Sequence, residues 1–120
     1  MFDYTTNKIS DSVIVVEVNG ELDESNRKYF FDCVSDMIES GSRYVIIECH
    51  GIGHLNSAAL ASLLTARKQA AKSGGQVYLT HVSSNIVEVL EITKLGRLLS
   101  VYPSTEAALE NIRSNPDSGV

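Results

Sequence analysis

The chain has 120 residues, of which 43% are hydrophobic and 21% are charged, a balance typical of one globular domain with a packed core. Ten basic and fifteen acidic residues give a net charge of −5. Because the chain has no basic block, this charge disfavours nucleic acids and anionic membrane surfaces as partners. No apolar run reaches the length of a membrane span, and the first residues lack the features of a signal peptide. We therefore expect a cytoplasmic protein without direct membrane insertion.

The cysteine content agrees with that compartment. Two cysteines are too few for a disulfide framework. Cys33 falls on the apolar side of a helical pattern and Cys49 follows a strand pattern. We interpret both as buried thiols in a reducing environment.

Strand and helix patterns alternate along the chain. Runs of β-branched and aromatic residues predict strands at 2–9, 13–18, 44–47, 77–79 and 98–102. Helical spacing predicts four helices, which follow the capping residues of 21–26, the Ser57 region, the pair Asn85 and Glu88, and Pro103-Ser104. The expected inward-facing residues of these helices are Phe30, Phe31, Val34, Met37 and Ile38; Leu60, Leu63, Leu64 and Ala71; Ile86, Val89 and Leu90; and Ala108, Leu109 and Ile112.

This order of elements predicts an α/β fold. The first two strands form a hairpin across the turn at Asp11 and Ser12, and the later strands alternate with helices, which favours parallel pairing and right-handed crossovers. We expect a mixed sheet of about five strands, mostly parallel after the N-terminal hairpin, covered by about four helices. One domain spans residues 1–113, and residues 114–120 form a flexible tail. Periodicity does not decide whether the helices cover one face of the sheet or both.

Residues 46–60 form a junction at which a buried strand passes through two glycines into an alanine-rich helix. Such junctions bring side chains and free backbone N–H groups to a ligand in α/β folds. Ser57 falls in or just before the first helical turn. Its simpler role is a helix cap, because serine is an ordinary residue there. Its alternative role is a phosphoacceptor, since the helix dipole and free N–H groups tolerate a phosphate at that end.

Three other kinds of chemistry are weaker at this junction. The turn from Gly51 to Asn56 resembles a dinucleotide fingerprint, but its third glycine and the acidic partner are missing, and a tight turn that needs glycine dihedrals is the simpler interpretation. Gly-x-Ser-x-Gly is absent, so Ser57 with His54 or His81 is a poor hydrolase candidate.

A metal group is the remaining candidate at the junction. Glu48, Cys49, His50 and His54 are possible ligands within seven residues, and His81 could join them. Strand alternation points Glu48 and Cys49 to opposite faces, and a metal site usually needs ligands that converge from a second segment. We therefore expect no metal.

An acidic segment precedes the first helix, at Glu21, Asp23 and Glu24. These acids suit a helix N-terminus, where the dipole favours negative charge. They also suit a charged contact surface for a basic partner. The residues alone do not separate the two roles.

Four segments occur in an order and spacing shared with a known family. They are Gly20-Glu21-Leu22-Asp23 after the second strand, Lys72-Ser73-Gly74-Gly75 before the strand at 77–79, the stretch from Val82-Ser83 to Val89-Leu90-Glu91-Ile92-Thr93-Lys94-Leu95, and Ser104-Thr105-Glu106-Ala107-Ala108-Leu109. Over roughly residues 8–112 the chain resembles a STAS domain, and specifically the single-domain anti-anti-sigma factors (anti-sigma factor antagonists) of bacteria. No single segment is specific, but their order is.

The resemblance implies a protein–protein switch. The family's phosphoacceptor segment, D-S-S/A-G-L, aligns with residues 56–60 and places Ser57 on the phosphorylated serine. The unphosphorylated protein is then expected to bind an anti-sigma factor that is a histidine-kinase-like serine kinase. Phosphorylation by that kinase breaks the complex, and a serine phosphatase restores it. The partner-binding residues expected from this alignment are Glu21, Asp23, Asn56, Ser57, Ala58 and Ala59.

Two departures from the family segment leave alternatives open. Asn56 replaces an aspartate and Ala59 replaces a glycine. An amide at residue 56 still caps a helix but cannot act as a base, and Ala59 adds a methyl group where a partner approaches. One alternative is a constitutive STAS binding or scaffold module, either transporter-associated or a subunit of a multi-protein complex. Another is a small nucleotide-binding protein that uses the turn from Gly51 to Ser57. We expect a protein that is not an enzyme, with no catalytic residue and no cofactor.

Overall fold

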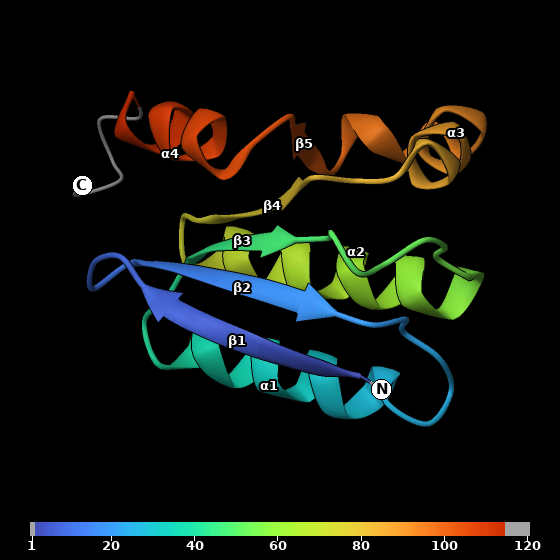
Figure 1. The fold of residues 1–120 in the computed structure, drawn as a ribbon. Helices are drawn as coiled ribbons and strands as arrows, with labels where there is room; N and C mark the ends of the chain where they lie inside the picture. The colour runs from blue at the N-terminus through green and yellow to red at the C-terminus, as the bar shows by residue number, and fades with distance from the viewer. Residues whose placement is uncertain (1, 115–120) are drawn as a thin grey trace.

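A computed structural model describes residues 2–114 of the chain, and the tail predicted at 114–120 lies outside this range except for Ser114. The elements are β1 (Asp3–Lys8), β2 (Val13–Asn19), α1 (Arg27–Glu39), β3 (Tyr44–Glu48), α2 (Ser57–Lys72), β4 (Gln76–Thr80), α3 (Ser84–Thr93), a 3-10 turn η1 (Leu95–Arg97), β5 (Ser100–Tyr102) and α4 (Thr105–Arg113). Figure 1 shows their arrangement.

The sheet follows the order of the sequence. Its five strands lie in the order β1-β2-β3-β4-β5, with β1 antiparallel to β2 and each later pair parallel. The predicted mixed sheet with an N-terminal hairpin is therefore confirmed. Because β2, β3, β4 and β5 are parallel, their carboxyl ends meet at one edge of the sheet.

Helices cover both faces of the sheet, which decides the point that periodicity left open. In β3, Val45 and Ile47 belong to the core beneath α1, α2 and α3. Tyr44 and Ile46 belong to a second, smaller core beneath α4. This split follows from the alternation of side chains along a strand. Because both faces of β2 and β3 are covered, nearly every residue of these strands is apolar.

Several local predictions are wrong at the ends of elements. α3 is capped by Ser83, whose Oγ accepts from Ile86 N at 3.2 Å, so the Asn85 and Glu88 pair is not the cap. β5 is shorter than the predicted strand because Leu98 and Leu99 hydrogen-bond back to Leu95 O in a 3-10 turn.

The helices also differ from the predictions at single positions. In the last turns of α2 the sequence predicted Ala71 to face inward, but Ala70 is buried there and Ala71 is exposed. The buried residues of α2 are Ala59, Leu60, Leu63, Ala66 and Ala70, which is the spacing of one helix face. Cys33 is only half-buried, while Cys49 is buried.

The acidic segment lies before α1 rather than in its first turn. α1 begins at Arg27, and its first turn has no acidic residue. Asp23 Oδ1 instead accepts hydrogen bonds from Ser25 Oγ at 2.6 Å, Ser25 N at 2.8 Å and Asn26 N at 3.2 Å. These bonds, first of all the one from the Ser25 side chain, lower the pKa of Asp23. The dipole role predicted for these acids is therefore replaced by a local turn.

Candidate functional site

The site is built around the amino-terminal end of α2, where Asn56 is the cap. Asn56 has extended backbone geometry, and its Oδ1 accepts from Ala59 N at 2.8 Å. Ser57 is the first residue of the helix and is exposed. Within residues 2–114 its hydroxyl has no hydrogen-bond partner. The cap interpretation of Ser57 is therefore wrong, and its hydroxyl is left open to a partner.

The two alanines after Ser57 have different environments. Ala58 is half-buried and faces a groove between α1 and α2. Ala59 is only 1% exposed and packs in the larger core. Its side chain therefore contributes packing, and the expectation that it contacts a partner does not fit this burial.

Glu21 connects the segment before α1 to the loop before α2. Its Oε1 accepts a short hydrogen bond from Gly53 N, and its Oε2 lies 3.8 Å from His54 Nδ1. Glu21 is thus bonded to the loop that leads directly into Ser57, although the two residues lie far apart in the sequence. Glu21 remains half exposed, so its charge contributes to the surface that precedes Ser57.

Asp23 lies two residues beyond Glu21 and is exposed. It is held by the turn described above, and its N–H donates to Asn26 Oδ1 at 2.9 Å. Asn26 Nδ2 in turn donates to Glu21 O at 3.0 Å. The structure therefore orders Asp23 within its own loop, whereas Glu21 alone of the two contacts the loop before α2.

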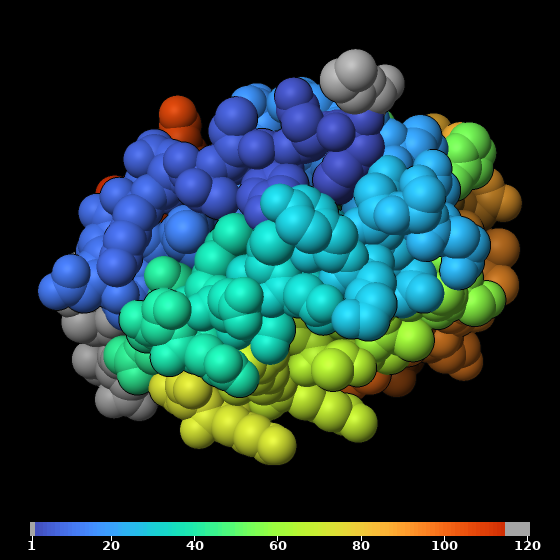
Figure 2. All heavy atoms as spheres, turned by 90° about the horizontal axis from the view of Figure 1, so that it is seen from below, coloured from blue at the N-terminus to red at the C-terminus, as the bar shows by residue number. Residues whose placement is uncertain are grey.

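A groove of about 440 Å³ runs between α1 and α2, and Ala58, the residue after Ser57, lines it. Its walls include Arg27, Phe31, Ala58 and Ser62, and Arg27 Nη1 donates to Ser62 Oγ at 3.2 Å. Figure 2 shows the face on which α1, in cyan, lies beside the yellow-green part of α2. No pattern in the sequence indicates this groove, because it depends on how closely two helices pack.

The glycine turn does not have the geometry expected for a phosphate cradle. Gly53 N already donates to the carboxylate of Glu21, and this negative group opposes a phosphate at that position. The prediction that the turn needs glycine dihedrals is also wrong, since the glycines with positive φ are Gly20, Gly41 and Gly74. Gly51 is needed for space: a Cβ there would meet Gly20 N, and would lie 2.8 Å from Asn19 Cα.

The fold separates Cys49 and His54 from the other two ligand-type residues of the junction, Glu48 and His50. Glu48 and Cys49 lie on opposite faces, as strand alternation predicts, because Cys49 belongs to the core beneath α1 and α2. Burial raises the pKa of Cys49 to about 12, and the charge of Glu48 adds to this effect. His54 lies near Glu21 and Asn85 instead, with 3.3 Å between its Nε2 and Asn85 Nδ2.

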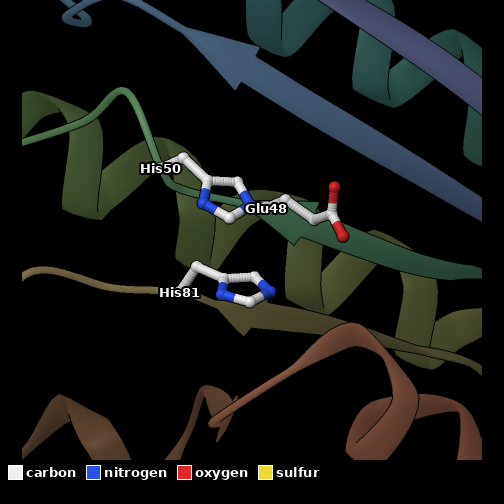
Figure 3. A group of neighbouring side chains, drawn as sticks. All are labelled: Glu48, His50 and His81. Carbon is white, nitrogen blue, oxygen red and sulfur yellow. The ribbon is translucent and has the colours of Figure 1, made fainter.

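A different set of ligand-type residues comes together on the α4 side of the sheet edge. Glu48, His50 and His81 offer ligand atoms that all lie within 4.8 Å of one another. Figure 3 shows these three side chains grouped at the ends of β3 and β4. His81 stacks on His50 with 4.1 Å between ring centroids. In the described part of the chain neither His54 nor His81 hydrogen-bonds to Ser57, so neither histidine is placed as its base.

The STAS domain family matches residues 4–108 of the chain. A proposed anti-sigma factor antagonist of Thermotoga maritima is 27% identical over 94% of this chain and 98% of its own length. An anti-sigma-B factor antagonist of Staphylococcus aureus is 26% identical over 80% of this chain and 89% of its own length.

Solved structures give the same assignment of the fold. The crystal structure of a proposed anti-sigma factor antagonist of Thermotoga maritima superposes with a TM-score of 0.83 at 27% identity, covering 94% of this chain and 95% of that one. The Bacillus cell fate determinant SpoIIAA in its phosphorylated form superposes with a TM-score of 0.72 at 17% identity, covering 92% and 100%. Within the described residues no helix is long and apolar enough to cross a membrane. From the match over most of its length, together with this fold, the chain belongs to the STAS domain family.

Proposed function

We propose that this protein is an anti-sigma factor antagonist that binds an anti-sigma factor through the surface around Ser57, and that phosphorylation of Ser57 ends this binding. The single observation that carries the proposal is the exposed Ser57 hydroxyl, free of hydrogen bonds within the described residues, at the start of α2. The names of the relatives support the class of partner.

The proposed docking surface combines the start of α2 with the loop that precedes it. Ala58, the residue after Ser57, lines the groove between α1 and α2. The Glu21 carboxylate accepts a hydrogen bond from Gly53 N, four residues before Ser57. Asn56 contributes its exposed side chain and fixes the helix start. A partner that docks here meets a small hydroxyl, a half-buried methyl group and one carboxylate.

Phosphorylation would change the charge of this surface more than its shape. A phosphoserine carries about −1.5 to −2 charges at pH 7. The helix N-terminus tolerates that charge, and the cap by Asn56 does not involve the Ser57 side chain. The fold is therefore preserved, while the phosphate adds to the charge of Glu21 and opposes an acidic or apolar partner surface.

The phosphate is expected to come from the partner. A histidine-kinase-like serine kinase would transfer it from ATP, and a serine phosphatase would remove it. Asn56 lies beside the acceptor and its amide cannot remove a proton. The kinase must therefore supply any base that activates the Ser57 hydroxyl, and this chain contributes the acceptor alone.

The test measures binding of the unmodified protein and of Ser57→Glu to a candidate anti-sigma kinase from the same genome, by calorimetry. We expect Ser57→Glu to bind at least about tenfold more weakly, which corresponds to 1.4 kcal/mol or more, and Ser57→Ala to bind like the wild type. Incubation with the kinase and ATP should add one phosphate to the wild type and none to Ser57→Ala, as read by intact mass.

A constitutive STAS module is the second candidate. The observation that favours it is the replacement of the family's aspartate and glycine by Asn56 and Ala59. Both replacements fit the fold, since Asn56 caps α2 and Ala59 packs in the core. Equal affinity of wild type and Ser57→Glu, with no phosphate added by the kinase, would favour this candidate over the switch.

A further inference from the structure

We propose that Glu48, His50 and His81 form a binding site for a divalent transition-metal ion such as Zn²⁺, on the α4 side of the sheet edge. Two imidazoles and one carboxylate are the ligand types that zinc and related ions select. Their ligand atoms lie within 4.8 Å of one another, and the side chains come from two neighbouring segments of the backbone (Figure 3). The site is separate from Ser57 and does not depend on the proposed switch.

The sheet register brings the three residues together. Glu48 pairs with Thr80 across the parallel strands β3 and β4. His50 therefore lies just after the end of β3, and His81 lies just after the end of the neighbouring strand β4. Glu48 and His50 are two residues apart, a spacing that places side chains on the same face of a strand. The ligands therefore come from two segments of the backbone, which is the convergence that a metal site requires.

The carboxylate is already oriented by an outer contact. Glu48 Oε2 accepts a short hydrogen bond from Thr105 Oγ1, at the start of α4. Such contacts from outside the ligand set fix the direction of a metal ligand. Within residues 2–114 no lysine or arginine forms an ion pair with Glu48. Glu17 lies beside Glu48 in the register of β2 and β3 and adds negative charge that attracts a cation.

Small side-chain rotations complete the geometry. Ligand atoms around zinc lie roughly 3 to 3.5 Å apart, given metal–ligand distances of about 2.0–2.2 Å. The rings of His50 and His81 are stacked, with 21° between their planes, so binding requires them to turn until their nitrogen lone pairs converge. Both histidines are exposed, and exposed side chains change rotamer readily. Three protein ligands leave one position for water.

The test is a calorimetric titration of the full chain, without a histidine tag, with Zn²⁺, and with Mg²⁺ as a hard-ion control. We expect one Zn²⁺ per chain, no response to Mg²⁺, and visible absorption when Co²⁺ replaces Zn²⁺. His50→Ala and His81→Asn should each weaken Zn²⁺ binding about tenfold or more. Asparagine is used at residue 81 because the φ of 55° there is a left-handed conformation that asparagine tolerates.

The chain supplies a matched control in His54, the one of its three histidines that is outside the proposed site. His54 is exposed and lies in the loop just after His50. His54→Ala should bind Zn²⁺ like the wild type. Circular dichroism without metal checks that each variant is folded, and Glu48→Gln provides a further variant that keeps an acceptor for Thr105. Absence of saturable Zn²⁺ binding to the wild type would overturn the proposal. So would His50→Ala and His81→Asn variants that are folded and bind as the wild type does, or an equal loss in His54→Ala.

Discussion

Two clusters of polar side chains lie at the carboxyl edge of the same sheet, one toward each face. The cluster around Ser57 is made largely by neighbours in sequence, because Asn56 caps the helix that Ser57 begins. The cluster of Glu48, His50 and His81 is made by strand pairing between β3 and β4. The first can be recognised in a linear motif, whereas the second exists only once the strands are in register.

The largest effect on stability should come from Gly51, where the loop before α2 lies against the backbone of residues 18–20. Gly51→Ala places a Cβ against Gly20 N and 2.9 Å from Val18 O, and backbone atoms cannot yield cheaply. We expect the free energy of unfolding to fall by about 3 kcal/mol, measured by urea denaturation.

The matched control is two residues away. At Gly53 an added Cβ would lie 3.4 Å from Glu21 Oε1, the end of a flexible side chain, so Gly53→Ala should cost less than about 1 kcal/mol. Equal losses at Gly51 and Gly53 would contradict the close approach between the segments before α1 and α2.

The same contrast explains what the sequence predicted well. Periodicity and β-branched runs located the five strands and four α-helices of residues 2–114, because local spacing reports which face of an element is buried. The order of elements then favoured the parallel sheet. The start of α2 was predicted because a capping residue, Asn56, directly precedes an alanine-rich helical pattern.

What the sequence did not predict depends on contacts between distant segments. The set Glu48, Cys49, His50 and His54 lies within seven residues of sequence, but strand alternation buries Cys49, and the loop places His54 near Glu21. His81 joins Glu48 and His50 in place of Cys49 and His54, because β4 lies beside β3 in the sheet. The Gly51 contact is of the same kind, since its reason is the backbone of another loop rather than its own dihedrals.

Cys49 follows Glu48 in sequence and is buried in the larger core, and it should make stability depend on alkaline pH. Burial raises its pKa from 9.0 to about 12, so the folded state favours the neutral thiol. That stabilisation is complete below pH 9 and is lost as pH rises toward 12. Between pH 8 and 10 this thiol should account for a loss of about 1.4 kcal/mol in the free energy of unfolding.

The Cys49→Ala variant isolates this contribution. It should be less stable than the wild type at pH 8, because a core side chain is shortened, but its stability should decline less between pH 8 and 10. Tyr78, whose pKa burial raises to about 12, is present in both proteins and cancels in the comparison. Parallel curves from urea denaturation at the two pH values would show that the Cys49 thiol ionises freely in the fold.

A smaller effect on stability should come from Asn56, the residue that caps α2. Asn56→Ala removes the acceptor for Ala59 N and should lower the free energy of unfolding by about 1 kcal/mol. Asn56→Asp keeps the acceptor and adds a charge that the helix dipole favours, so its stability should equal or slightly exceed that of the wild type. Thermal denaturation of the three proteins at neutral pH makes this comparison, and a loss in Asn56→Asp as large as in Asn56→Ala would contradict the cap.

The smallest effect on stability should come from Ser57 itself. Its side chain is exposed and has no hydrogen-bond partner among the described residues, so Ser57→Ala should change the free energy of unfolding by less than about 0.5 kcal/mol. Urea denaturation beside Asn56→Ala measures the difference. A residue that serves the fold loses stability when it is truncated, whereas one that serves a partner does not. A loss at Ser57 as large as at Asn56 would therefore assign the hydroxyl to the helix and remove the basis for a docking surface centred on it.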